Sequence, residues 1–142
     1  MYYVNREQIE RRLDVIPELV QVLKSTATLQ DKTLIERYAE ERAIHLAIEV
    51  VTDVGSYLID GFIMRDASSY EDIVDIMYDE KVIDESLNTT FTDLVRMRRP
   101  LVQEYFDNNR RGYDELTVQI SASLERFSHK VLDYLDKEEI PS

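Results

Sequence analysis

Residues 31–60, DKTLIERYAEERAIHLAIEVVTDVGSYLID, form the longest stretch of the chain with a regular helical pattern of apolar side chains. From Leu34 to Leu58 the pattern repeats every four residues, interrupted at Arg42, and further apolar residues widen the apolar face on both sides. The stretch contains no proline and can form a helix about 45 Å long at about 1.5 Å per residue. Such a helix needs neighbours on more than one side, so we expect it to be the central helix of a bundle.

Shorter helical patterns lie on either side of this stretch. Together they predict five helices, over about residues 5–24, 31–60, 69–80, 84–99 and 112–136. Asn5 and Ser69 are placed as N-caps of the first and third helices. Pro17 predicts a kink inside the first helix, because proline lacks the N–H that an interior helical position donates. Pro100 disfavours helical geometry at the preceding residue and predicts a break there.

These patterns predict an all-α fold, an up-down bundle of about five helices. The length of 142 residues suits a single domain, 1–142, with its core at about 5–136, and 44% apolar residues can fill that core. Three Gly and three Pro are too few for a turn-rich β-sandwich. We find no internal repeat and no second composition regime.

Composition and charge exclude several classes of function. The chain carries 17 basic and 29 acidic residues and a net charge of −12, which argues against non-specific nucleic-acid binding over the whole surface. The absence of Cys excludes a disulfide scaffold, a thiolate zinc site and a cysteine nucleophile. With two His, we expect no metal site and no cofactor. The sequence has neither a membrane-spanning run nor a signal-peptide pattern, so we expect a cytoplasmic protein.

One segment reverses the charge. Residues 96–111, RMRRPLVQEYFDNNRR, hold five Arg against two acidic residues, for a local charge of +3. The five are candidates for binding a phosphate-bearing group; they are Arg96, Arg98, Arg99, Arg110 and Arg111. The alternative is that they pair with the surplus of surface carboxylates. Turn-forming residues surround them, as is typical of a functional helix junction.

This segment resembles the signature of the HepT-like proteins, the DUF86 branch of the HEPN superfamily, which are all-helical ribonuclease toxins of type VII toxin–antitoxin systems. The family pattern is Arg, often followed by Asn, with His five positions after the Arg and Tyr two positions later. Arg98 and Tyr105 match this pattern, and Arg99 stands where Asn is usual. Gln103 stands where the His is expected.

The resemblance implies a metal-independent RNA endonuclease with a defect. In such cleavage the 2′-hydroxyl of the RNA attacks the phosphate, so the enzyme needs a proton carrier and a cation that stabilises the phosphorane. Arg98 suits the second role, because a guanidinium matches phosphate oxygens and stays charged. Gln103 cannot titrate as a His would, so we expect activity that is weak or lost. Tyr105 matches the residue that a nucleotidyltransferase antitoxin of the MntA type adenylylates.

The second predicted helix adds to the resemblance. Its residues 36–59, ERYAEERAIHLAIEVVTDVGSYLI, are similar to the ER-rich second helix of the family, in which an acidic pair recurs one turn apart. Here the pair is Glu49 and Asp53, which could orient Arg98 across the bundle or form solvated surface charge. His45 has Glu41 and Glu49 four residues away on either side, which favours a salt-bridged histidine on a helix face.

Three hypotheses stay open from the sequence. The first is a homodimeric ribonuclease of the toxin type with weak or absent catalysis. It would bind RNA at the basic patch, which is formed by the five arginines of residues 96–111. The second is a non-catalytic dimeric interaction module, which binds a nucleotidyltransferase partner or a nucleotide through Arg98, Arg99 and Tyr105. The third is a structural helical bundle whose arginines are neutralised by ion pairs.

Overall fold

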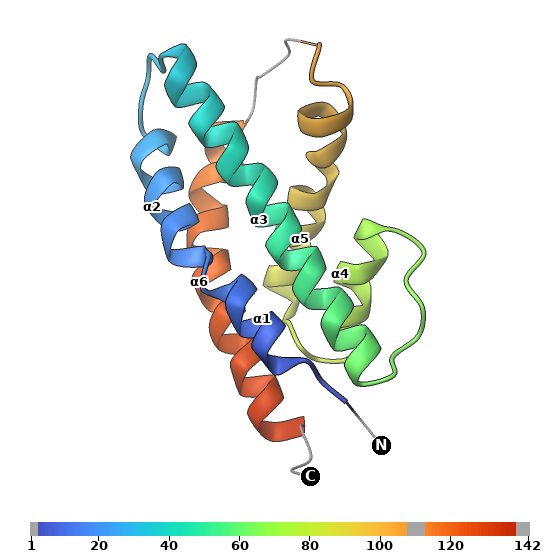
Figure 1. The fold of residues 1–142 in the computed structure, drawn as a ribbon. Coiled ribbons are helices and arrows are strands. Elements are labelled where there is room, and N and C mark those ends of the chain that lie inside the picture. Colours follow the sequence, from blue (N-terminus) through green and yellow to red (C-terminus); the bar gives the residue numbers. More distant parts are fainter. Residues whose placement is uncertain (1–2, 108–112, 139–142) are drawn as a thin grey trace.

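The computed structural model describes residues 3–107 and 113–138, and the regular structure in these residues is entirely helical (Figure 1). The elements are α1 (Arg6–Leu13), α2 (Ile16–Ala27), α3 (Leu34–Gly61), α4 (Tyr70–Asp79), α5 (Glu85–Arg96), the π-helical turn η1 (Arg99–Gln103) and α6 (Tyr113–Glu138). The predicted all-α bundle is confirmed. Among the described helices, α2, α3, α5 and α6 alternate in direction, and α1 and α4 lie beside them.

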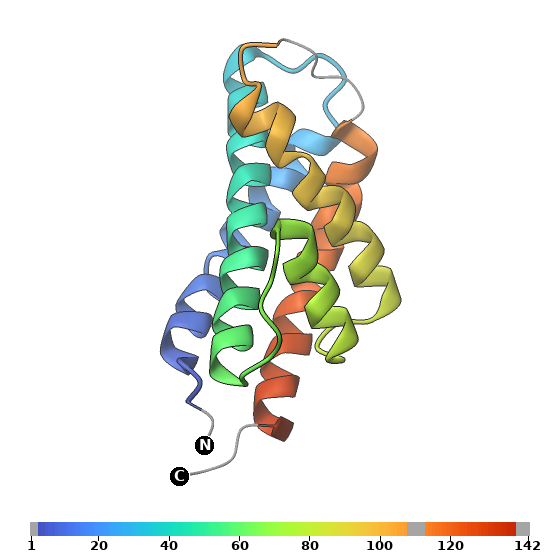
Figure 2. The same cartoon turned by 90° about the vertical axis from the view of Figure 1, so that its right-hand side faces the viewer.

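Helix α3 is the central element, as its apolar pattern predicts. It packs against α1 and α2 on one side and against α4, α5 and η1 on the other (Figures 1 and 2). Buried side chains occur along its length from Glu40 to Ile59. Its N-terminus is closed by a capping box, in which the Thr33 hydroxyl accepts from the Glu36 N–H and the Glu36 carboxylate accepts from the Thr33 N–H.

The first predicted helix is two helices, which corrects the expectation of one helix with a kink. Helix α1 ends at Leu13 and α2 begins at Ile16, and Pro17 lies in the first turn of α2. A proline is well tolerated there, because the first N–H groups of a helix have no partner inside the helix. Leu13 and Ile16 are both buried, so the break lets both helices turn apolar side chains into the core.

Two of the predicted helix starts are confirmed by their caps, whereas the central helix begins at Leu34, three residues later than predicted. The side chain of Asn5 accepts from the Gln8 N–H, and the hydroxyl of Ser69 accepts from the Asp72 N–H. Helix α5 begins after Asp84, close to the predicted start. None of the helices in the described ranges has both the length and the apolar composition that a membrane span requires.

Helix α4 approaches α3 closely at Gly55. A Cβ atom built at this glycine would overlap the Cγ2 methyl of Ile73 and lie 3.2 Å from Cε of Met77, both on α4. A glycine at this position therefore allows the two helices to touch.

We expect Gly55→Ala to lower the free energy of unfolding. Overpacking a core contact costs about 1–3 kcal/mol, which outweighs the gain of roughly 1 kcal/mol in helix propensity, since the branched Ile73 is held in the core. Urea unfolding followed by circular dichroism measures the change. The exposed neighbour is the control, and Ser56→Ala should shift stability by less than about 0.5 kcal/mol. Equal stability of the two variants would contradict the close approach of the helices.

Asp84 links the start of α5 to α6. Its carboxylate accepts from the Leu87 N–H at 2.9 Å and forms ion pairs with Arg126 and Lys130 of α6. The backbone hydrogen bond, followed by the Arg126 charge, lowers the pKa of Asp84 below its usual value. The stabilisation is therefore present above the unfolded-state pKa of about 4 and is lost as the pH falls through the lower folded-state pKa.

At pH 7 we expect Asp84→Ala to lose about 1 kcal/mol of stability, the usual contribution of an N-cap side chain. The difference from the wild type should shrink in strongly acidic solution, where the wild-type carboxylate is protonated. Asp84→Asn keeps a capping oxygen and serves as the control, with a smaller loss at pH 7. Denaturant unfolding across this pH range tests the assignment, and a loss that does not depend on pH would refute it.

Candidate functional site at the junction of α5 and η1

Pro100 shapes the backbone at the end of α5. Because proline has no N–H, the α-helical hydrogen bond to the carbonyl of Arg96 cannot form. The chain widens instead into η1, where the Glu104 N–H donates to the carbonyl of Arg99 at 2.8 Å. The break predicted at Pro100 is thus a π-helical turn, a feature that often lies at functional sites.

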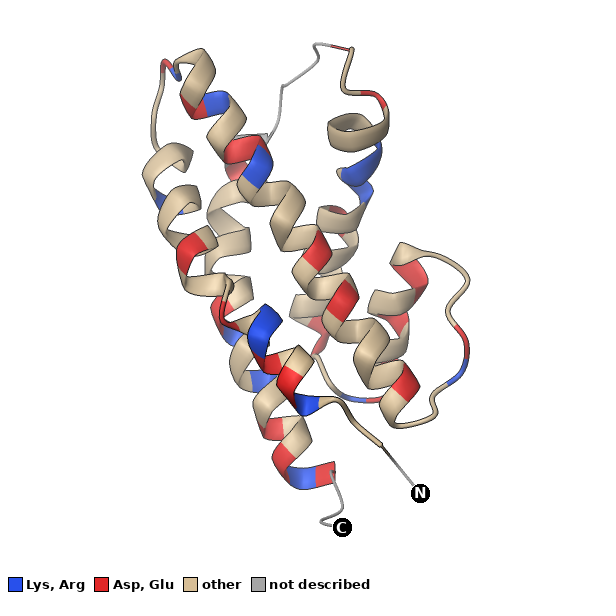
Figure 3. Ribbon diagram, in the orientation of Figure 1, with Lys and Arg blue, Asp and Glu red and all other residues tan. Residues whose placement is uncertain are grey.

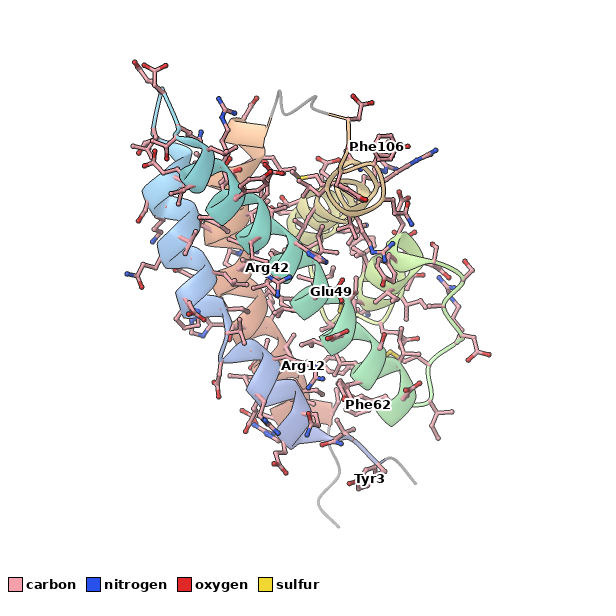
Figure 4. All side chains as sticks on the ribbon, turned by 45° about the horizontal axis from the view of Figure 1, so that its top comes forward. Tyr3, Arg12, Arg42, Glu49, Phe62 and Phe106 are labelled. Carbon is pink, nitrogen blue, oxygen red and sulfur yellow. The ribbon has the colours of Figure 1, made fainter. Side chains whose placement is uncertain are left out.

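The motif residues lie in this one short segment. Arg98 stands directly before η1 and is half-buried, and Gln103 is the last residue of η1 and is exposed. Tyr105 and Phe106 follow, with 73% and 75% of their surface exposed, and their rings meet edge to face at 5.8 Å. Figure 4 shows Phe106 at the outer end of the segment. Gln103 and Tyr105 are therefore open to solvent, whereas Arg98 is only partly so.

Two of the arginines in this segment form ion pairs. Nε of Arg96 lies 2.9 Å from the carboxylate of Glu71 on α4, and this hydrogen bond raises the pKa of Arg96. Nε of Arg99 lies 3.1 Å from the carboxylate of Glu104. The ion-pair alternative is therefore correct for these two. Arg110 and Arg111 lie outside the described residues.

Arg98 has a different environment. Its guanidinium carbon lies 4.5 Å from the centroid of the Tyr70 ring, at the start of α4. Its Nε is buried and donates no hydrogen bond. Within the described part of the chain, no carboxylate comes within ion-pair distance of Arg98. Its charge is therefore not neutralised by a partner, although the surrounding helices are rich in acidic residues (Figure 3).

The predicted orienting contact from Glu49 and Asp53 to Arg98 is not formed. Glu49 instead lies 3.6 Å from Nε2 of His45, and Asp53 lies 3.4 Å from Nε of Arg12. Figure 4 shows Glu49 part-way along α3, well away from the end of η1. Glu49 is one of the two glutamates predicted beside His45, and the histidine lies on the helix face next to it, as predicted.

Sequence reasoning missed the residues that do contact the arginines. Tyr70 and Glu71 form the start of α4, and the rest of α4 and all of α5 separate them from Arg98 in the sequence. Nothing in the sequence around them indicates a contact with the arginines. Over residues 3–107 and 113–138, no group of three His, Cys, Asp or Glu side chains is placed to hold a metal ion.

Comparison with known proteins places this arrangement in a family. The family profile described as "Ribonuclease HepT-like" matches residues 9–131. The chain belongs to the HepT-like family. The resemblance predicted from Arg98, Tyr105 and the second helix is therefore confirmed.

The relatives of this HepT-like protein include YutE of Bacillus subtilis. The protein named "Putative RNase YutE" from strain 168 is 36% identical over 138 residues, which cover 97% of this chain and 94% of that protein. A solved structure of YutE, described as a cytosolic protein of unknown function, superposes with a TM-score of 0.87 at 34% identity. That match covers 100% of this chain and 98% of the other, so the similarity includes the whole bundle.

Proposed function

We propose that this HepT-like protein acts on RNA as a member of the ribonuclease-toxin type, with Arg98 as the cation that binds the scissile phosphate. The proposal depends on one observation: Arg98 has no carboxylate partner and lies in the same short segment as the exposed Gln103 and Tyr105. The family and the name of YutE support the choice of RNA as substrate. We propose the cytosol, the location given for YutE, as its compartment.

RNA cleavage needs a group that takes up a proton, a group that returns it and a cation that stabilises the phosphorane. The 2′-oxygen of the RNA forms a bond to phosphorus, the bond to the 5′-oxygen of the next nucleotide breaks, and a proton moves from the first oxygen to the second. Arg98 would stabilise the charge on the phosphorane. The amide of Gln103 can hydrogen-bond to these oxygens but cannot transfer the proton. Loss of a general acid–base residue costs about 10²–10⁴ in rate, so we propose that cleavage is weak or lost.

The exposed side chains at the same end of the bundle favour a second candidate, a dimeric interaction module. Tyr105 and Phe106 are exposed, and so is an apolar group in the first turns of α3, formed by Leu34, Ile35 and Tyr38. A two-fold dimer would cover part of this surface. The exposed Tyr105 side chain would accept the adenylyl group of ATP in a reaction catalysed by a nucleotidyltransferase antitoxin: the hydroxyl oxygen bonds to the α-phosphorus, the hydroxyl loses its proton and pyrophosphate leaves.

We expect Gln103→His to raise the rate of RNA cleavage by about 10²–10⁴, because it restores a group that titrates near neutral pH. A fluorescently labelled single-stranded RNA, assayed in the presence of a metal chelator, measures the rate. Adding Arg98→Ala to this variant should remove the gain.

Gln21→His is the matched control, since it places the same side chain on the exposed face of α2. It should leave the rate unchanged. No cleavage by Gln103→His would reject the defective ribonuclease site and favour the interaction module.

We expect the wild-type protein to sediment as a dimer and Ile35→Asp to shift it towards the monomer. Ile35 is 81% exposed, and an acidic residue in the first turn of a helix is favourable, so the substitution should not unfold α3. Ile63→Asp is the control, because Ile63 is also exposed but follows the opposite end of α3. A monomeric wild type, or a dimer that tolerates Ile35→Asp, would reject this dimer face.

A further inference from the structure

The face of an aromatic ring, rather than a carboxylate, holds Arg98. The guanidinium carbon lies 4.5 Å from the centroid of Tyr70, and the buried Nε makes no hydrogen bond. An arginine without hydrogen-bond partners would normally sample many rotamers, because its side chain carries about 2 kcal/mol of rotamer entropy. Stacking on a ring restricts the plane of the guanidinium, which is the property that a phosphate-binding fork requires.

The helix turn that carries the ring is anchored by its neighbours. Tyr70 is the first residue of α4, directly after Ser69, whose hydroxyl caps the helix. The next residue, Glu71, pairs with Arg96 of α5. Asp72 accepts two hydrogen bonds of 2.8 Å from Arg65, so the first turn of α4 is anchored on both sides of the ring.

An aromatic partner leaves the charge of an arginine unneutralised, whereas a carboxylate partner does not. A carboxylate neutralises the charge of an arginine and occupies its N–H donors, as Glu71 and Glu104 do for Arg96 and Arg99. A ring face attracts the cation through its quadrupole and leaves both the charge and the in-plane donors free for another ligand. Arg98 thus keeps its charge and the N–H donors at the end of its guanidinium for a phosphate, while its Nε is buried against the protein.

We propose that Tyr70 is the positioning residue that orients Arg98 towards an RNA phosphate. This proposal rests on the proposed function for the identity of the ligand, whereas the effect of Tyr70 on Arg98 is independent of any ligand. Since the ring face makes the contact, phenylalanine replaces tyrosine without loss, and an aliphatic residue does not replace it.

The test compares Tyr70→Phe and Tyr70→Leu with the wild type. Tyr78→Leu is the matched control, because Tyr78 lies on the same helix with nearly equal exposure, 38% against 37% for Tyr70. Circular dichroism and thermal unfolding of all variants establish that they are folded.

The first measurement uses no ligand. The NMR signal of the Arg98 Nε–H, assigned by its loss in Arg98→Lys, should be displaced by the ring current in the wild type, Tyr70→Phe and Tyr78→Leu. In Tyr70→Leu it should move to the position of exposed arginines. A signal that does not move in Tyr70→Leu overturns the proposal, whatever the protein does to RNA.

The second measurement uses a short single-stranded 2′-O-methyl RNA, which binds but lacks the nucleophile for cleavage. We expect Tyr70→Leu to weaken binding about five- to thirtyfold, and Tyr70→Phe and Tyr78→Leu to bind as the wild type does. The salt dependence should fall by roughly 0.7 in slope in Tyr70→Leu, the value for one lost phosphate contact on a single strand.

The two measurements separate the two proposals. If the NMR signal moves in Tyr70→Leu but Arg98→Ala binds RNA as the wild type does, the proposed function of Arg98 fails and the contact with Tyr70 is structural. If Tyr70→Phe loses binding as Tyr70→Leu does, the hydroxyl and not the ring face matters, and the positioning proposal fails. Tyr70→Phe therefore keeps the proposal open to rejection even if Tyr70→Leu does not fold.

Discussion

The need to cover a long helix on several sides determines how the rest of this molecule is arranged. Helix α3 carries apolar residues around much of its circumference, so that α1, α2, α4, α5 and η1 all pack on it. The contact at Gly55 sets how near α4 can come. The position of α4 in turn places Tyr70 beside Arg98. The packing of α4 on α3 therefore affects the geometry of the candidate site.

A second constraint acts locally, at Pro100. A missing N–H widens the helix by one π-turn and presents the residues that follow to solvent, at an end of the bundle where apolar side chains of α3 are also exposed. Arg98, Gln103 and Tyr105 of the motif thus all lie in or directly beside this π-turn. Because neighbouring carboxylates neutralise Arg96 and Arg99, the basic patch is smaller in effect than the count of arginines indicates. Arg98 is the described member of the patch that keeps its charge available.

The HepT-like family is described as ribonucleases, which makes an RNA phosphate the natural ligand to consider for Arg98. If proton transfer is lost at Gln103, as proposed, the protein binds a phosphate without cleaving the RNA efficiently. A site that binds RNA without cutting it efficiently would still need an oriented cation. The proposed roles of Tyr70 and Arg98 are therefore compatible with both a slow ribonuclease and an RNA-binding or partner-binding module. The difference between these functions depends on the chemistry available at position 103.

The features that could be predicted from the sequence are those that depend on near neighbours. The helical periodicity of residues 31–60, the caps at Asn5 and Ser69, the break at Pro100 and the register of Arg98 and Tyr105 all follow from interactions within a few residues of the chain. The partner of each charged group, in contrast, depends on how the helices pack. Acidic residues outnumber basic ones, so composition offered every arginine a carboxylate, and Glu49 and Asp53 were reasonable partners for Arg98. Packing instead gave them His45 and Arg12, and it gave Arg98 the ring of Tyr70. Ion pairs and ring contacts act over a few ångströms, and distances of that size between separate helices are set by the packing of the core.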